Sequence, residues 1–272
     1  LVAVGDRVYV TLGLDAPVSV LDAATGESIR TYKNTKGTEE IILSDGQLFA
    51  LVGEQPLKGK PYEQIYSYCW DETKRANTGW AWSGREKQIT ALHPQTGRIA
   101  WRKKFPVAPM SMASAEGRVV FYNGDKVVCL DSESGEQIWE SKPVESQSPI
   151  QTGFAPRVVL QDGVVVFSGG NRKMTGLSLD DGEMLWTRPQ ERSGHHSPWD
   201  VLVVDGVAWS GGIAGGRQIG TFVGYDIHTG EVKGKFDPDV DIYWFHHRCY
   251  PSKATTNYLM VSRTGIEPTE AP

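Results

Sequence analysis

Two histidine pairs are the residues of this sequence best suited to do chemistry. His195-His196 and His246-His247 stand 51 residues apart. Neutral imidazole is the commonest metal ligand in proteins, and three or four converging histidines could hold Zn, Cu, Mn or Fe. We take His195, His246 and His247 as candidate ligands of a transition metal. A carboxylate such as Asp200 or Glu39 could complete that site.

An anionic ligand is a second interpretation of the same region, because arginines such as Arg172 accompany the histidines. A third is that one histidine of each pair packs outward while the other caps a loop, with no ligand at all. All three interpretations stay open, since a His-His dipeptide is not a ligand motif by itself. The candidate ligand-binding residues are His195, His196, Trp199, Arg217, Trp244, His246, His247 and Arg248.

The other reactive side chains give little sign of chemistry. Cys69, Cys129 and Cys249 are far apart, with no C-x-x-C spacing, which argues against a zinc ribbon, a thioredoxin-type motif or haem attachment. Cys129 lies in an apolar run and should pack as a small hydrophobic residue. Cys69 and Cys249 could form a disulfide or remain free thiols. No G-x-S-x-G motif is present, so a serine or cysteine triad has no support and the catalytic residues stay unknown.

A repeated turn motif shows which elements must position the histidines. The motif reads Asp-x-x-Thr-Gly, with variations, and its glycines are separated by 71, 38, 47 and 48 residues. Asp and Thr hydrogen-bond to the backbone of a tight turn, and Gly takes the positive φ that the turn needs. Three copies carry a Trp four residues after the glycine, where packing between repeats is expected. The motif glycines are Gly26, Gly97, Gly135, Gly182 and Gly230, and the tryptophans are Trp101, Trp139 and Trp186.

A second turn precedes each motif, and apolar residues alternate on both sides of it. These turns are Gly5-Asp6, Asp45-Gly46, Glu116-Gly117, Asp162-Gly163 and Asp205-Gly206. They are typical of hairpins, so each repeat should hold four short strands, here called A to D. Four-stranded units of roughly 40 to 48 residues are typical of propeller blades. We predict an all-β, single-domain β-propeller over residues 1–272, with about five blades and part of another.

The order of the strands places their connections on two opposite faces of the propeller. The A–B and C–D turns should share one face, and the variable B–C and D–A connections the other, where binding sites usually lie. His195 lies eleven residues before Gly206, and His246 lies eleven before the equivalent Asn257. Since strand A should line the central channel, the two pairs are expected at matching heights at its mouth. Earlier repeats have Thr35, Pro106 and Thr152 there, so the histidines are not part of the scaffold's own pattern.

An insertion at about 54–88 lies between strands B and C of the second repeat. Its six aromatic residues could form a lid or a stacking platform, or a small core over the blades, which we favour. They are Tyr62, Tyr66, Tyr68, Trp70, Trp80 and Trp82. The glycine-rich stretch 211–216 lacks the Gly-Lys-Ser/Thr ending of a phosphate-binding loop and reads as a B–C connection.

Composition excludes two broad classes of protein. No apolar run approaches the roughly 18 to 20 residues of a membrane-spanning helix. The 28 Lys and Arg are scattered among 33 Asp and Glu, which argues against a dedicated nucleic-acid-binding protein. The first residues, Leu1-Val2-Ala3, enter a strand directly and show no signal peptide, which is compatible with a processed or trimmed chain.

The Asp-x-x-Thr-Gly-x-x-x-Trp repeat resembles the PQQ-like repeat of quinoprotein alcohol dehydrogenases and of the outer-membrane assembly lipoprotein BamB. Stretches 245–250 and 262–267 are similar to bacterial PQQ-binding-like propeller proteins without an assigned reaction. The resemblance covers essentially the whole chain and implies a propeller. Quinoprotein propellers usually have eight blades, so this chain is either part of a larger ring or a ring of fewer blades.

Three functions follow, in order of preference. The first is a ligand-binding or protein-interaction module of the bacterial cell envelope or periplasm, not catalytic by itself, as the resemblance to the assembly lipoprotein implies. The second is a metal-dependent enzyme or oxidoreductase that uses the histidine cluster. The third, implied only by the quinoprotein resemblance, is a dehydrogenase with PQQ and calcium in the channel. Those enzymes typically carry a disulfide between adjacent cysteines, and this chain has no Cys-Cys dipeptide. A protein partner or a small molecule would bind the loop-rich face.

Overall fold

A computed structural model of the 272-residue chain describes most of its scaffold. The described residues are 1–13, 15–53, 82–150, 156–190, 201–211 and 221–237, together with three short strands at 253–254, 259–261 and 269–270. They form antiparallel sheets joined by turns, with one short 3₁₀ helix, η1 (Lys33–Thr35). This is the all-β architecture that the repeats predict.

The first three sheets each contain four strands, paired in chain order. Blade 1 consists of β1 (Val2–Val4), β2 (Arg7–Thr11), β3 (Val18–Asp22) and β4 (Ser28–Thr31). Blade 2 consists of β5 (Thr38–Ser44), β6 (Gln47–Val52), β7 (Lys87–Leu92) and β8 (Ile99–Phe105). Blade 3 consists of β9 (Ala113–Ala115), β10 (Arg118–Tyr122), β11 (Val127–Asp131) and β12 (Gln137–Glu140).

Two further four-stranded sheets and one three-stranded sheet follow. Blade 4 consists of β13 (Arg157–Gln161), β14 (Val164–Ser168), β15 (Lys173–Ser178) and β16 (Met184–Pro189). Blade 5 consists of β17 (Leu202–Val204), β18 (Val207–Ser210), β19 (Phe222–Asp226) and β20 (Val232–Phe236). The partial blade 6 consists of β21 (Lys253–Ala254), β22 (Leu259–Val261) and β23 (Thr269–Glu270). The predicted count of five blades and part of another is confirmed.

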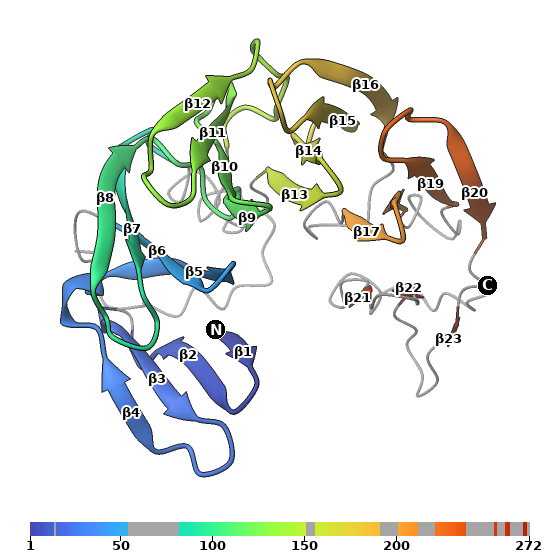
Figure 1. The fold of residues 1–272 in the computed structure, drawn as a ribbon. Helices are drawn as coiled ribbons and strands as arrows, with labels where there is room; N and C mark the ends of the chain where they lie inside the picture. The colour runs from blue at the N-terminus through green and yellow to red at the C-terminus, as the bar shows by residue number, and fades with distance from the viewer. Residues whose placement is uncertain are drawn as a thin grey trace, which may run out of the picture.

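The sheets stand around a common centre in the order of the chain (Figure 1). The first strand of each blade is innermost, and each touches the first strand of the next blade, from β1 and β5 through to β17 and β21. Blade 1 and the partial blade 6 stand at the two ends of this arc (Figure 1). Strand A therefore lines the centre, as the sequence predicts.

The short turns form because of their residue types. At the A–B turns of blades 2 to 5 both central residues have positive φ, for example 48° and 73° at Asp45 and Gly46, which is the type I′ geometry of tight hairpins. At the C–D turn of blade 3, Asp131 Oδ1 accepts hydrogen bonds from the Ser134 amide and hydroxyl, both at 2.8 Å. These bonds, chiefly those from Ser134, lower the pKa of the Asp131 carboxyl. The predicted roles of Asp, Thr or Ser, and Gly in the motif are confirmed.

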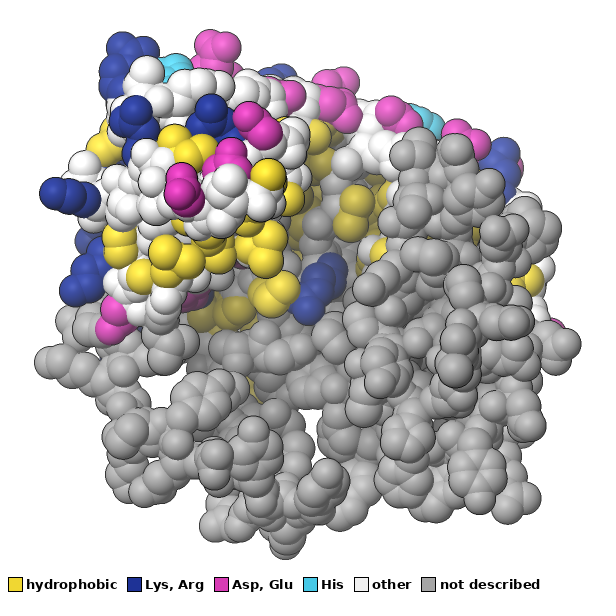
Figure 2. Space-filling model, turned by 90° about the horizontal axis from the view of Figure 1, so that it is seen from below, with side chains coloured by type: hydrophobic (Ala, Val, Ile, Leu, Met, Phe, Trp, Pro, Cys, Tyr) yellow, Lys and Arg dark blue, Asp and Glu magenta, His cyan; other side chains and the backbone are white. Residues whose placement is uncertain are grey.

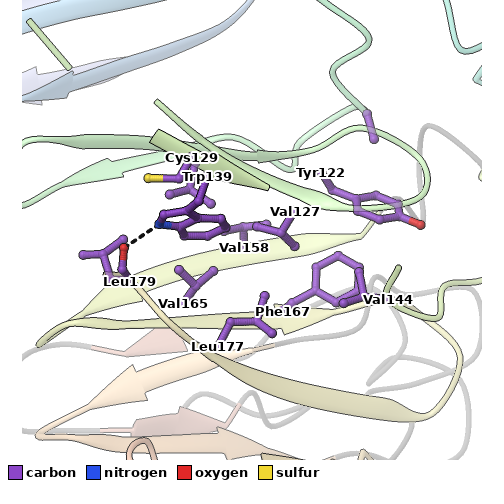
Figure 3. Close-up of a cluster of buried hydrophobic side chains, with 12 residues drawn as sticks. Tyr122, Val127, Cys129, Trp139, Val144, Val158, Val165, Phe167, Leu177 and Leu179 are labelled. Carbon is purple, nitrogen blue, oxygen red and sulfur yellow. Dashed lines mark hydrogen bonds between the residues drawn. The ribbon is translucent and has the colours of Figure 1, made fainter. Parts of the chain in front are cut away.

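Each motif Trp joins its own blade to the next one. Trp139 in β12 is buried, and its indole Nε1–H donates to the carbonyl oxygen of Leu179 in blade 4 at 2.8 Å (Figure 3). The ring covers Gly182 so closely that a Cβ there would lie 2.5 Å from the indole. We call this pairing of an aromatic ring, a carbonyl acceptor and a motif glycine a blade lock. Equivalent locks join Trp101 to Ser132 and Gly135, and Trp186 to Ile227 and Gly230.

Blade 1 is locked to blade 2 by a residue that the repeat pattern does not point to. The position equivalent to the motif tryptophans is Arg30, whose guanidinium donates to the Thr96 carbonyl at 2.9 Å. Tyr32, two residues later, lies over Gly97, and its hydroxyl donates to the Pro94 carbonyl. A tyrosine just past the end of β4 thus reaches the same kind of acceptor from a different sequence position.

The hydrophobic core lies between neighbouring sheets. Between blades 3 and 4 the buried side chains include Tyr122, Cys129 and Trp139 from one sheet, and Val165 and Phe167 from the other (Figure 3). Similar clusters lie between blades 1 and 2, blades 2 and 3, and blades 4 and 5. Each sheet therefore depends on its neighbours to exclude water from both of its faces.

Candidate functional site

The loop-rich face lies opposite the short turns, at the strand ends that the B–C and D–A connections join. The inner strand β5 begins there with Thr38, and β13 begins there with Arg157. Acidic side chains gather along the opposite, turn-bearing rim, at the top of Figure 2, where the Asp-rich turns lie. The candidate site is the group of charged residues at the loop-side ends of the inner strands.

Glu39 is part of an ion pair at this edge. Its Oε2 lies 2.6 Å from Nζ of Lys87, the first residue of β7, and the Lys87 side chain is only 12% exposed. Glu39 is one of the carboxylates that could complete the metal site expected from the sequence. In the structure its charge is already balanced by Lys87.

Glu40, next to it, lies against the connection between β8 and β9. A bulge in β5 between Thr38 and Glu40 shifts the register, and the Glu40 carboxyl meets the main chain of Met110. Its Oε2 is shut off from solvent without a hydrogen-bond partner among the described residues. Burial raises the pKa of Glu40 to about 7, although the positive charges of Lys87 and Arg157 act in the opposite direction.

This buried carboxyl makes stability depend on pH. Because the pKa of Glu40 is higher in the folded state, the folded protein binds the proton more tightly, so stability falls as the pH rises from about 4.5 through about 7. We expect Glu40→Gln to raise the melting temperature at pH 8 and to do so much less at pH 5. Thermal unfolding at the two pH values measures this difference.

Glu39→Gln is the matched control, because it removes a neighbouring carboxylate that has a partner, Lys87. It should bring no gain at pH 8. An equal effect of Glu40→Gln at pH 5 and pH 8 would contradict the assignment of a buried, readily protonated carboxyl.

Glu40, Lys87 and Arg157 do not belong to any motif of the sequence and were not expected at the site. Two of them, Glu40 and Arg157, could have been noticed in the sequence. Each is a charged residue near the beginning of an inner strand, before the apolar alternation begins. Arg172, named from the sequence as a cation of this face, is exposed in the connection between β14 and β15. The structure therefore adds one acidic side chain, Glu40, and two basic ones, Lys87 and Arg157, to the arginine expected there.

The predicted site residues themselves lie outside the described residues. They are His195, His196, Trp199, Asp200, Arg217, Trp244, His246, His247 and Arg248. What the structure does give is the position of the strands that follow the histidines. His195 precedes Leu202, the start of β17, by seven residues, and His246 precedes Lys253, the start of β21, by seven. Because β17 and β21 touch, the two pairs precede neighbouring inner strands by the same number of residues, and their own positions stay a prediction.

The described residues do not fit the quinoprotein cofactor. Cys129 is fully buried, and burial raises the pKa of its thiol to about 12, so it packs as a hydrophobic residue, as predicted. Cys69 and Cys249 lie outside the described part and are not adjacent in sequence. Within the described ranges, no three His, Cys, Asp or Glu side chains come close enough together to hold a metal ion. We assign no step to PQQ or calcium.

Trp82 is the one aromatic residue of the insertion that the structure describes. Its ring lies over Gly124, where a Cβ would be 2.6 Å from the indole, and it packs against the core between blades 3 and 4. The contact is that of a core residue. Tyr62, Tyr66, Tyr68, Trp70 and Trp80 lie outside the described part, so their role as a lid, platform or small core stays a prediction.

The described part of the chain contains no helix with the length and apolar character needed to cross a membrane.

Comparison with known proteins agrees with this architecture. The chain is 25% identical over 263 residues to the outer membrane protein assembly factor BamB of Burkholderia pseudomallei, a match that takes in 87% of this chain and 64% of the relative. It is 29% identical over 150 residues to BamB of Nitrosomonas eutropha, across 53% of this chain and 33% of the relative. The chain thus spans less than two thirds of the length of these relatives.

A solved structure shows the same fold. The crystal structure of BamB from Moraxella catarrhalis superimposes with a TM-score of 0.55 and 14% identity, over 96% of this chain and 73% of that one. The family model described as outer membrane protein assembly factor BamB matches residues 85–235, from the edge of β7 to the last strand of blade 5. The chain therefore belongs to the BamB family of PQQ-like repeat propellers.

Proposed function

We propose that this chain is a protein-interaction module of the cell envelope, which holds partner proteins during outer-membrane assembly and carries out no chemistry of its own. The family match over residues 85–235 carries this proposal, because its name denotes an assembly factor. The periplasm is the compartment that this role implies.

The polar and aromatic residues of the repeated motif have structural roles, which supports the same function. Motif Asp side chains bind turn backbones, and the motif Trp side chains bind neighbouring blades. The described cysteine is buried in the core, where its raised pKa keeps it a thiol. A rigid scaffold with its variable connections on one face is suited to binding rather than to covalent catalysis.

Site-specific photo-crosslinking tests where partners bind. Met110, on the loop-rich face, is 56% exposed, and Met184, on the outer strand β16, is 53% exposed, so the two positions form a matched pair. With a photoreactive amino acid at each position in living cells, we expect adducts with outer-membrane proteins or their assembly factors from position 110 but not from position 184. Mass spectrometry identifies the adducts. Equal yields from both positions, or adducts with unrelated proteins only, would contradict the proposal.

A metal-dependent activity is the second candidate function. The observation in its favour is the equal seven-residue spacing between each histidine pair and its inner strand, β17 or β21. If the pairs bind a metal, the purified protein should carry it stoichiometrically, and His246→Ala should lose it because one imidazole ligand is gone. His228→Ala is the control, since His228 is exposed in a turn. Elemental analysis decides, and metal-free wild-type protein after metal supplementation would rule this function out.

A further inference from the structure

Two stretches of the chain carry basic side chains and no acidic ones. They are 28–36, which takes in β4 and η1 and has three Lys or Arg, and 98–105, which takes in β8 and has four. In four of the five motif copies a Glu follows the motif glycine, whereas in blade 2 this residue is Arg98. The first motif residue of that blade is also basic, His93. Blade 2 therefore lacks the negative charge that the other turns carry.

The fold brings the two stretches together at the junction of blades 1 and 2. The guanidinium of Arg30 donates to the carbonyl oxygen of Thr96 at 2.9 Å, across 66 residues of sequence. The guanidinium of Arg102 donates to the carbonyl oxygen of Asn34 at 3.5 Å. Both acceptors are neutral, so these contacts position the two guanidinium groups without cancelling their charges. Basic residues that are scattered in the sequence thus share one surface.

This surface extends from the turn-bearing rim to the loop-rich face. Arg98 directly follows the turn glycine Gly97, whereas Lys33 and Lys36 lie in the connection from β4 to β5. Lys and Arg side chains are visible along the left margin of Figure 2, the side on which β4 and β8 lie in Figure 1. We call the five exposed cations of this junction the basic strip: Arg30, Lys33, Lys36, Arg98 and Arg102. Among the described residues, no carboxylate forms an ion pair with any of them.

Several exposed lysines of the later blades do have acidic partners. The side chains of Lys142, Lys173 and Lys233 are 80%, 49% and 52% exposed, and their Nζ atoms lie 3.0, 2.5 and 3.4 Å from a carboxylate oxygen. The chain as a whole has a formal charge of −5, so the positive charge of the strip is local. A concentration of one sign of charge on a surface attracts a partner of the opposite sign.

We propose that the basic strip binds the surface of a membrane that contains anionic lipids. The strip lies on the outer strands, at the circumference of the arc, where a flat surface can reach all of it at once (Figure 1). Each Lys or Arg close to such a surface strengthens binding about fivefold. A protein partner fits less well, because the centres of protein interfaces are depleted of Lys and of charged residues in general.

The proposal goes beyond the protein-interaction function and does not depend on it. Binding through the circumference would leave the loop-rich face at the side of the molecule, pointing along the membrane. That face would then stay open to protein partners while the strip holds the lipid surface.

Vesicle sedimentation tests the proposal. The protein is mixed with vesicles of phosphatidylcholine alone, or of phosphatidylcholine with phosphatidylglycerol, and the bound fraction gives a partition coefficient. We expect wild-type protein to bind the mixed vesicles, to bind phosphatidylcholine much more weakly, and to dissociate at high salt, which screens exposed charges. The combined variant Lys33→Gln, Lys36→Gln and Arg98→Gln should lower the partition coefficient on mixed vesicles about a hundredfold. These three side chains are exposed, so their replacement leaves the core intact.

The matched control removes three cations from other blades. The combined variant Lys142→Gln, Lys173→Gln and Lys233→Gln changes the net charge by the same amount, and these lysines have acidic partners. It should bind like wild type, because salt screens charges far from the contact. Soluble polyglutamate is added as a competitor that stands for an acidic protein segment.

Four results would overturn the proposal. Wild-type protein does not bind mixed vesicles at low salt, or it binds both kinds of vesicle equally. The control variant loses as much binding as the strip variant. Polyglutamate displaces the protein at carboxylate concentrations below that of the lipid phosphate, which would assign the strip to an acidic protein. The lipid and salt dependence are measured on wild-type protein, so they decide even if the strip variant unfolds. Crosslinking from position 110 is a separate measurement, so this proposal and the proposed function can fail independently.

Discussion

Trp139→Ala should lower the free energy of unfolding by about 3–5 kcal/mol, the range for removing a large aromatic side chain from a core. Trp139 is 8% exposed and contributes to the cluster between blades 3 and 4. Its removal leaves a cavity over Gly182 and deprives the Leu179 carbonyl of its donor. Urea unfolding monitored by circular dichroism measures the loss.

Two control variants separate the contribution of the hydrogen bond from that of the buried apolar contact. Trp139→Phe keeps much of the apolar contact but leaves the Leu179 carbonyl unpaired, which should cost about 1–3 kcal/mol. Ile138→Ala alters the neighbouring residue, which is 42% exposed, and should stay within about 0.5 kcal/mol of wild type. If Trp139→Ala were no more destabilising than Ile138→Ala, the blade lock would not hold these sheets together.

Gly182→Ala should destabilise the protein by about 1–3 kcal/mol more than Gly163→Ala, the typical cost of overpacking. The two glycines have nearly the same positive φ, 75° and 73°, so a side chain suffers the same backbone strain at both. They differ in space, because a Cβ at Gly182 would lie 2.5 Å from Trp139, whereas a Cβ at Gly163 would have nothing within 4 Å. The difference between the two variants therefore isolates the contact with the indole.

The same denaturation experiment measures both variants. The double variant Gly182→Ala with Trp139→Ala provides an internal check, because the added methyl group no longer meets the ring. In that background Gly182→Ala should cost no more than Gly163→Ala does in wild type. A Gly182→Ala variant as stable as Gly163→Ala would mean that the ring is not seated as described.

The scaffold could be predicted from sequence because its determinants are local. A D-G pair or an Asp-x-x-Thr-Gly phrase fixes its own turn, so the number of strands and their order follow from a few residues each. Tyr32 escaped the pattern because it lies two positions after Arg30, the equivalent of the motif tryptophans, and just past the end of β4. A periodic pattern identifies equivalent sequence positions. In blade 1 the equivalent contact is made by a residue at a different position.

The charged group at the loop-side ends could not be predicted in the same way. The burial of Glu40 results from a bulge in its own strand and from the Met110 segment of the next blade, 70 residues away in the chain. Such a contact depends on how blades pack, which residue types and spacing do not encode locally. The two histidine pairs stay a prediction from spacing, supported by the starting points of β17 and β21.

The blade locks also bear on how such a chain can change its length. Each lock takes its ring from one repeat and its glycine and carbonyl from the next, as with Trp101 and Gly135. If a repeat supplies both its ring and its glycine and carbonyl, duplicating or deleting that whole repeat therefore leaves a complete lock between every two neighbouring blades. Insertions of part of a repeat would separate a ring from its acceptor. Gene rearrangements that change the number of blades should thus be tolerated when they add or remove whole blades. The connections on the loop-rich face can vary independently.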